Sequence, residues 1–353
     1  MTESPKTSDR KPKHFGPGFF ATLVLVVLAA AAIAWHEGIL QPQPTIALVT
    51  NNSDPFWDPV IRGAQDAASK YSVHVKIVKG DGSAEHQSNV VRQLMNEGVR
   101  GLGISPIDAN EQAPVLREVA VRMPLVTFDS DCPDSSRLWF VGTDNYAAGR
   151  QCGTIVHSAL PDGGEVLISM GSATAENAIL RRQGVIDELL ERDSWGKQRD
   201  PIEGVLQGSK YTIVATSVDN HDKGRATQLT IDQIKAHPNL KCIVALYSYS
   251  APAVLDALQQ TGRLGQIKVI GFDVLPETLD ALEAGNVVAT MQQAQYDFGV
   301  DTVRAIVTAM RGGLGGMGSS PLRYTNVRPI LRDDVAKVRQ ELGQSSAAAA
   351  GGK

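Results

Sequence analysis

From residue 45 onward, short apolar runs alternate with amphipathic stretches, and this alternation constrains the fold more than any other feature of the chain. Strands are predicted at residues 45–50, 73–78, 101–104, 125–128, 138–141, 165–169, 211–217, 242–246, 268–272 and 287–291. Helices are predicted at residues 60–70, 86–97, 110–122, 149–159, 177–192, 223–236, 252–261, 276–284 and 298–311. The two successive sets indicate βαβ units and predict an α/β protein with two doubly wound parallel-sheet lobes.

Polar and aromatic side chains follow several of the predicted strands. In an open α/β sheet, ligands bind beyond the carboxyl ends of the strands, so these positions are candidates for function. They include Asp54, Phe56, Trp57, Asp129, Asn177, Arg181, Asp273 and Gln293. The adjacent aromatic residues either pack beneath the following helix or stack on the C–H face of a sugar. Each acid either caps a turn or accepts hydrogen bonds from hydroxyl groups, and both interpretations stay open at this point.

The N-terminus carries a basic segment followed by an uncharged apolar run. Lys6, Arg10, Lys11 and Lys13 precede residues 19–35, which would span about 26 Å as a helix. This length is short for a membrane span and slightly long for a signal-peptide core. The charge distribution predicts that the N-terminal end stays in the cytoplasm and the rest is exported. Cleavage among the small residues 30–34 and retention as an anchor both remain open.

Length and charge limit the remaining possibilities. The 353 residues suffice for two domains with their own cores, and the net charge of −4 argues against nucleic acid or anionic lipid as partners. The three cysteines, Cys132, Cys152 and Cys242, allow one disulfide but imply no disulfide framework. None of them lies near the apolar run, where a lipid-modified cysteine anchor would have to be.

Motifs for catalysis or cofactor binding are absent from the sequence. The histidines and cysteines form no cluster at metal-ligand spacing, and there is neither a GxSxG turn nor a glycine-rich phosphate loop. The glycine-rich residues 313–318 follow a predicted helix and suggest a linker. We therefore expect no catalytic residue, no metal and no cofactor.

Several short motifs occur in an order typical of one family. They are Pro55-Phe56-Trp57, Thr127-Phe128-Asp129-Ser130-Asp131, Gly142-Thr143-Asp144-Asn145-Tyr146 with Gly149, Arg181 with Gly184, Gly271-Phe272-Asp273, and Gln293 with Tyr296 and Gly299. On these motifs, residues 45–332 resemble the periplasmic sugar-binding proteins of ABC transporters. This is the type I, ribose-binding-protein-like group, whose fold is shared with LacI-type repressor cores.

The resemblance implies roles for individual residues. Phe56 and Trp57 match the aromatic pair that sandwiches the sugar ring, and Asp54 matches a polar position that contacts hydroxyls. Asp129 and Arg181 match the acid of the first lobe and the arginine of the second. Asp273 and Gln293 match the acid and the amide near the hinge.

Two departures from the family pattern concern the residues that would contact the ligand. Ser130 stands where the family often has arginine, which puts a ribose-type contact pattern in doubt. The segment from Tyr247 to Ser250 replaces an Asn-Asp pair, and Tyr247 suggests a second stacking surface.

Residues 1–44 would hold the signal or anchor helix with its flanking segments, and the Ser-, Ala- and Gly-rich C-terminal composition predicts a disordered tail at residues 341–353. The resemblance implies a domain arrangement for the rest of the chain. The first lobe would comprise residues 45–143 and 294–324, and the second lobe residues 144–293 and 325–340. Three crossovers would form the hinge between the lobes.

The expected function is that of a monomeric, non-catalytic, extracytoplasmic protein, secreted or anchored. It would capture a monosaccharide or polyol in the interlobe cleft and deliver it to an ABC permease. The alternative is a ligand-sensing module for a chemoreceptor or sensor kinase. A repressor core would need a helix-turn-helix in place of residues 1–43, and an exported enzyme would need a nucleophile–base pair or a metal site.

Overall fold

The structure, a computed structural model, describes residues 22, 24–29, 43–193, 197–313 and 320–350. The chain divides into the unit Met1–Gln43 and the compact unit Pro44–Lys353, which contains both sheets. Most of the expected signal or anchor segment, and residues 314–318 of the expected linker, lie outside the described residues. No helix in the described part of the chain is long and apolar enough to cross a membrane.

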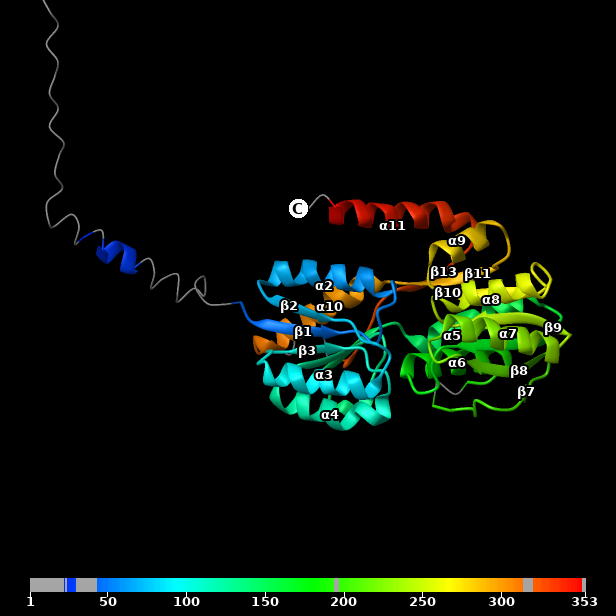
Figure 1. Ribbon diagram of the computed structural model, residues 1–353, viewed down its shortest axis with the longest axis horizontal. Helices are drawn as coiled ribbons and strands as arrows, with labels where there is room; N and C mark the ends of the chain where they lie inside the picture. The colour runs from blue at the N-terminus through cyan, green and yellow to red at the C-terminus, as the bar shows by residue number, and fades with distance from the viewer. Residues whose placement is uncertain (1–21, 23, 30–42, 194–196, 314–319, 351–353) are drawn as a thin grey trace, which may run out of the picture. The chain divides into compact units, whose positions relative to one another are not determined.

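The first lobe is built on a six-stranded parallel sheet (Figure 1). The order is β12 (Leu322–Tyr324), β5 (Trp139–Gly142), β4 (Leu125–Phe128), β3 (Leu102–Ile104), β1 (Thr45–Val49) and β2 (His74–Val78). Helices α2 (Trp57–Tyr71) and α10 (Gln295–Met310) cover one face, and α3 (Ala84–Asn96) and α4 (Ala109–Arg122) cover the other. The lobe therefore has helices on both sides of its sheet.

The second lobe repeats this plan with a seven-stranded sheet. The order is β13 (Val327–Ile330), β11 (Ala289–Gln293), β10 (Lys268–Phe272), β9 (Leu240–Ala245), β6 (Gly164–Met170), β8 (Tyr211–Val218) and β7 (Leu206–Gln207). The edge strands β13 and β7 pair antiparallel, and the other strands are parallel. The helices are α5 (Asn145–Ala159), α6 (Glu176–Leu189), α7 (Lys223–Ala236), α8 (Ser250–Gln260), α9 (Pro276–Glu283) and α11 (Val335–Ala350).

Burial on both faces of each sheet explains why the strands read as continuous apolar runs. All four residues of β4 are buried, as parallel strands between two helical layers require. Each lobe has two hydrophobic clusters, one on either side of its sheet. The three cysteines are free and buried within these clusters.

Three crossovers join the lobes and form the hinge that the resemblance predicts. The chain passes from β5 to α5, from β11 to α10, and from β12 to β13. Hydrogen bonds tie these crossovers together: Thr325 N–H donates to the Gly142 carbonyl (2.8 Å), and Ala294 N–H donates to the Asn326 carbonyl (3.2 Å). The prediction of a type I, two-lobed α/β fold is therefore confirmed.

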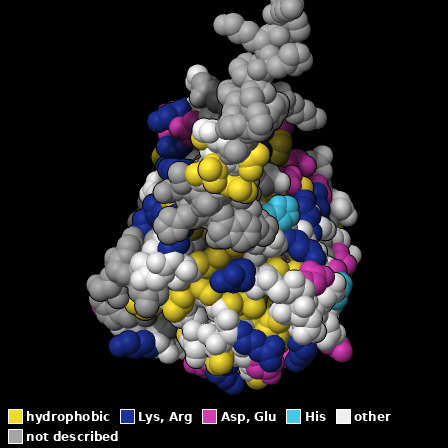
Figure 2. All heavy atoms as spheres, turned by 90° about the vertical axis from the view of Figure 1, so that its left-hand side faces the viewer, with side chains coloured by type: hydrophobic (Ala, Val, Ile, Leu, Met, Phe, Trp, Pro, Cys, Tyr) yellow, Lys and Arg dark blue, Asp and Glu magenta, His cyan; other side chains and the backbone are white. Residues whose placement is uncertain are grey.

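The structure differs from the sequence-based elements mainly near the chain's end and at the sheet edges. Helix α11 runs to Ala350, whereas the composition of residues 341–353 predicts a disordered tail. The short edge strands β7, β12 and β13 carry no apolar run that would predict them. The face of the first lobe at the amino ends of its strands, in the lower part of Figure 2, mixes hydrophobic side chains with lysines and arginines. The candidate site lies at the opposite, carboxyl ends of these strands.

Candidate ligand-binding cleft

A cavity between the two lobes is lined by residues that follow β1, β4, β9 and β10 and by side chains of α2 and α6. Because its lining comes from both lobes, a small molecule bound in this cavity contacts both of them.

Asp129 connects the two lobes at this cavity. It follows β4 in a left-handed conformation (φ 60°), which aspartate tolerates better than most residues. Its Oδ2 accepts hydrogen bonds from Ser105 Oγ (3.2 Å) in the first lobe and from Asn177 Nδ2 (3.0 Å) in the second. Burial raises the pKa of Asp129 to about 6, although the nearby Arg181 guanidinium acts in the opposite direction.

Arg181 extends from α6 and is only 2% exposed. Its guanidinium donates to Asn145 Oδ1 (2.7 Å), the Leu246 carbonyl (3.1 Å) and Gln293 Oε1 (2.9 Å). Its Nη2 lies 3.9 Å from Asp129 Oδ1, and its Cζ lies 4.0 Å from the centre of the Phe272 ring. These bonds use three of its five N–H groups, so two form no hydrogen bond within the described residues.

Asp273 occupies the equivalent position in the second lobe, directly after β10. It also has a left-handed backbone (φ 66°). Gln293 Nε2 donates to its Oδ1 at 2.9 Å, and Gln293 Oε1 accepts from Thr143 Oγ1 (2.8 Å) in the first crossover. Gln293 therefore links Asp273, Arg181 and the hinge. Burial raises the pKa of Asp273 to about 7, against the opposing effect of Arg181.

The aromatic loop before α2 is partly a core element. Trp57 is 2% exposed, and its indole Nε1–H donates to Asn52 Oδ1 (2.8 Å). Phe56 is half-buried and stands perpendicular to Trp57, with ring centroids 4.8 Å apart. A sugar ring cannot lie between two rings in this arrangement, so a sandwich needs an opposing surface from the second lobe.

The loop after β9 provides aromatic rings on the opposite side of the cavity. Tyr247 and Tyr249 both line it, with ring centroids 5.8 Å apart. The Tyr249 hydroxyl donates to Asp219 Oδ1 (2.6 Å). Between them, Ser248 Oγ reaches Asp54 Oδ1 across the cleft at 3.5 Å.

The structure brings most of the predicted site residues together and leaves two away from the cavity wall. Around the cavity lie Asp54, Phe56, Trp57, Asp129, Arg181, Tyr247 and Asp273. Gln293 lies behind Arg181 and Asp273. Ser130 is fully buried beside the site and is not among the lining residues.

Sequence reasoning omitted several residues that the structure adds to the site. Asn51, Asn52, Ser248 and Tyr249 line the cavity, and Asn145 holds the Arg181 guanidinium. Asn177 is among the candidates that follow a strand, and in the structure its side chain donates to Asp129. Position after a strand end could have indicated Asn51, Asn52, Ser248 and Tyr249, whereas the role of Asn145 depends on how α5 packs on α6.

The raised pKa of Asp273 predicts how stability depends on pH. Between its unfolded value of 3.8 and its folded value of about 7, the folded state holds a proton that the unfolded state has released. The free energy of unfolding contributed by this group should fall as pH rises through that window, by at most about 1.4 kcal/mol per unit. Burial lowers the pKa of His221 and opposes this trend. The measurement is urea unfolding of wild type and Asp273→Asn from pH 4.5 to 7.5. If the free energy of unfolding depended on pH in the same way in both proteins, the prediction would be contradicted.

Comparison with known proteins places the chain in a family. Residues 46–314 match the periplasmic binding protein domain, and the chain belongs to this family. The family is a substrate-binding one, and membership implies an extracytoplasmic location. The fold and the interlobe cavity agree with this assignment.

Individual relatives and solved structures are similar over most of their length. The D-allose-binding periplasmic protein of Escherichia coli K12 is 26% identical over 306 residues, which cover 84% of this chain and 91% of the relative. A D-ribose/D-allose-binding protein of Pseudomonas aeruginosa is 26% identical and covers 74% of this chain and 81% of its own. An ABC transporter solute-binding protein from Burkholderia graminis, solved in complex with D-arabinose, superposes with a TM-score of 0.75 at 26% identity. That match covers 83% of this chain and 97% of the other.

Proposed function

We propose that this protein captures a monosaccharide or a related polyol in the interlobe cleft and delivers it to the permease of an ABC transporter. The observation that carries the proposal is the Asp129 site, where an acid of the first lobe meets Asn177 and Arg181 of the second. A ligand that binds these groups from both lobes is held only when the lobes are close, and it therefore favours closure.

The roles of the side chains follow from their chemistry. Asp129 and Asp273 accept hydrogen bonds from sugar hydroxyls, and Arg181 donates to hydroxyl or ring oxygens. Phe56 stacks on one face of the ring, and Tyr247 provides a surface on the opposite side. Gln293 holds Arg181 and Asp273 in position. The protein acts as a monomer outside the cytoplasm, with residues 19–35 as its cleaved signal or retained anchor.

A thermal-shift screen tests this function. Allose, ribose, arabinose, glucose, galactose and a set of polyols are each added to the purified protein. A ligand at about 100 times its Kd adds about 2.7 kcal/mol to the free energy of unfolding, which raises the melting temperature measurably. We expect at least one such sugar or polyol to do so. A well-folded protein that none of them stabilises would contradict the proposal.

A further inference from the structure

The cavity has more carboxyl groups than cationic groups. Asp54, Asp129 and Asp273 line it, and Arg181 is the one cationic side chain among its described lining residues. Asp129 lies within ion-pair distance of Arg181, and Arg181 also lowers the pKa of Asp273. Among the described residues, Asp54 forms no ion pair, so a ligand cation at this carboxylate would displace no cationic side chain.

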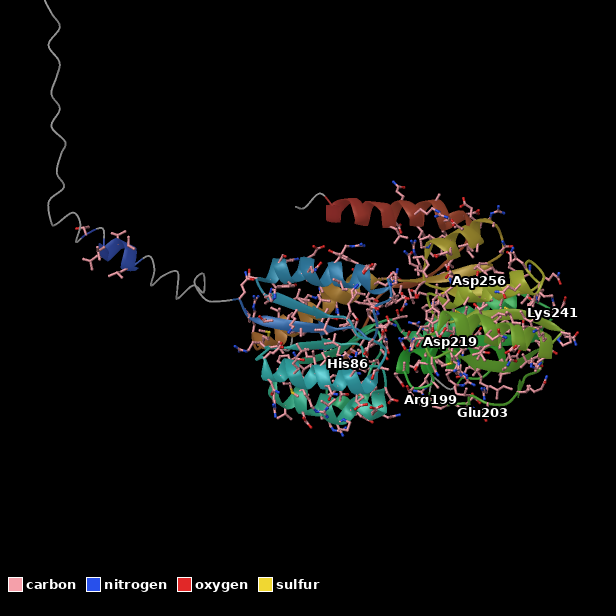
Figure 3. The ribbon with its side chains drawn as sticks, viewed as in Figure 1. His86, Arg199, Glu203, Asp219, Lys241 and Asp256 are labelled. Atoms are coloured by element: carbon pink, nitrogen blue, oxygen red, sulfur yellow. The ribbon has the colours of Figure 1, made fainter. Side chains whose placement is uncertain are left out.

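One buried hydrogen-bond acceptor without a partner lines the cavity, and another belongs to a residue that holds the lining residue Tyr249. Asn51 lines the cavity, is 8% exposed, and its Oδ1 accepts no hydrogen bond within the described residues. Asp219 follows β8 in the second lobe (Figure 3) and is fully buried. One of its oxygens holds Tyr249, and its Oδ2 likewise has no described partner. Buried polar atoms are normally satisfied, so unpaired acceptors point to a ligand that donates.

Aromatic rings enclose the same region. Phe56 and Trp57 lie on the first-lobe side, and Tyr247 and Tyr249 on the second-lobe side. A cation near the faces of such rings is attracted by their quadrupoles, most strongly where water is excluded. The carboxylate of Asp54 and the aromatic rings thus both favour a cationic ligand group at this end of the cleft.

The numbers of hydrogen-bond donors and acceptors favour an ammonium group over a hydroxyl group at this position. A hydroxyl donates one hydrogen bond and brings two acceptor lone pairs of its own, whereas an ammonium donates three and accepts none. An ammonium also offsets the charge of Asp54. A quaternary ammonium would satisfy the rings but would leave the acceptors unpaired.

We propose that the ligand is an amino sugar, whose protonated amine lies against Asp54 between the rings of the two lobes. This inference rests on the proposed function and specifies its ligand class. The opposite end of the sugar meets Asp129, Asp273 and Arg181 through its hydroxyl groups.

Calorimetric titration with matched ligand pairs tests the proposal. Glucosamine, galactosamine and mannosamine are compared with glucose, galactose and mannose, slightly below neutral pH so that the amines are protonated. We expect at least one amino sugar to bind at least tenfold more tightly than its hydroxyl parent. Its neutral N-acetyl form should lose this advantage, and added salt should reduce it.

The Asp54→Asn variant tests whether Asp54 causes the preference for an amino sugar over its hydroxyl parent. Asparagine retains a side-chain oxygen that can accept from Phe56 N–H, as Asp54 Oδ1 does at 2.8 Å, so the loop should keep its turn. The variant should bind the amino sugar and its parent with similar affinity. A wild-type protein that binds the neutral sugars as tightly as the amino sugars would overturn this inference and leave the proposed function intact. If neither these six sugars nor the thermal-shift panel bind, both fail.

Discussion

Arg181→Ala should weaken sugar binding by more than about 1.5 kcal/mol, which is more than tenfold in Kd. The substitution removes the one guanidinium among the described residues that line the cavity. It also removes the guanidinium donor from Asn145 Oδ1 and the Leu246 carbonyl, and it leaves Gln293 Oε1 with Thr143 Oγ1 as its donor. Because Arg181 lowers the pKa of both Asp129 and Asp273, these carboxyls should take up protons more readily in the variant. We expect a loss of about 3 kcal/mol in the free energy of unfolding, at the lower end for breaking a buried ion pair.

The neighbouring residue supplies a matched control. Arg182 is 4% exposed, and its guanidinium faces away from the cavity. It donates to Thr216 Oγ1 (2.8 Å) and to the carbonyls of Asp200 (2.8 Å) and Pro201 (2.6 Å). Arg182→Ala should also destabilise the protein, yet it should leave the Kd within about twofold. Equal losses of affinity in the two variants, or none in Arg181→Ala, would show that Arg181 has no specific role.

Gly149→Ala should be strongly destabilising for so small a change, because α5 and α6 contact each other through their backbones at this point. A Cβ on Gly149 would lie 2.1 Å from the Arg181 carbonyl oxygen. Since the obstacle is backbone, the helices must separate, at a cost of at least about 3 kcal/mol, the upper end for overpacking. Arg181 would move with its helix, so the affinity for sugar should fall as well.

Substitutions at two other glycines distinguish the loss of stability from the loss of sugar affinity. A Cβ on Gly299 of α10 would lie 1.9 Å from the Val60 carbonyl oxygen of α2. Gly299→Ala should therefore destabilise the first lobe without displacing Arg181. In α7, a Cβ on Gly224 would meet only Asp222 Oδ1 at 3.3 Å, so Gly224→Ala should cost little. Urea unfolding and sugar titration of the three variants check the pattern. A harmless Gly149→Ala would contradict the close packing of α5 on α6.

The fold could be predicted from sequence because the parallel strands and their covering helices have different apolar periods. Strand β4 and helix α7 have the predicted bounds. Strand β11 does not: the apolar Val287 and Val288 suggest an earlier start, but β11 pairs with β10 only from Ala289 onward. Gln293 is therefore the last residue of the strand. Edge strands such as β12 form because β5 offers a free edge, and no local pattern marks them.

The site could be predicted only in part, because strand ends are local features and side-chain contacts are not. Asp129 and Asp273 follow strands and reach the cavity as expected. Trp57 also follows a strand, yet most of its ring belongs to the core of the first lobe. Asp219 follows β8 as well, but its importance appears only when Tyr249, thirty residues further along, donates to it. Such pairs depend on how loops of different strands meet.

The most direct test of an interlobe binding site is the distance between the lobes with and without sugar. Glu85 and Lys223 are exposed on the first turns of α3 and α7, and each helix follows a strand end at the cleft. Cysteines at these two positions can carry a donor and an acceptor dye, because the three native cysteines are buried. We predict that a sugar found to bind raises the energy-transfer efficiency as the lobes close on it. An unchanged efficiency at saturating sugar would contradict a ligand held by both lobes.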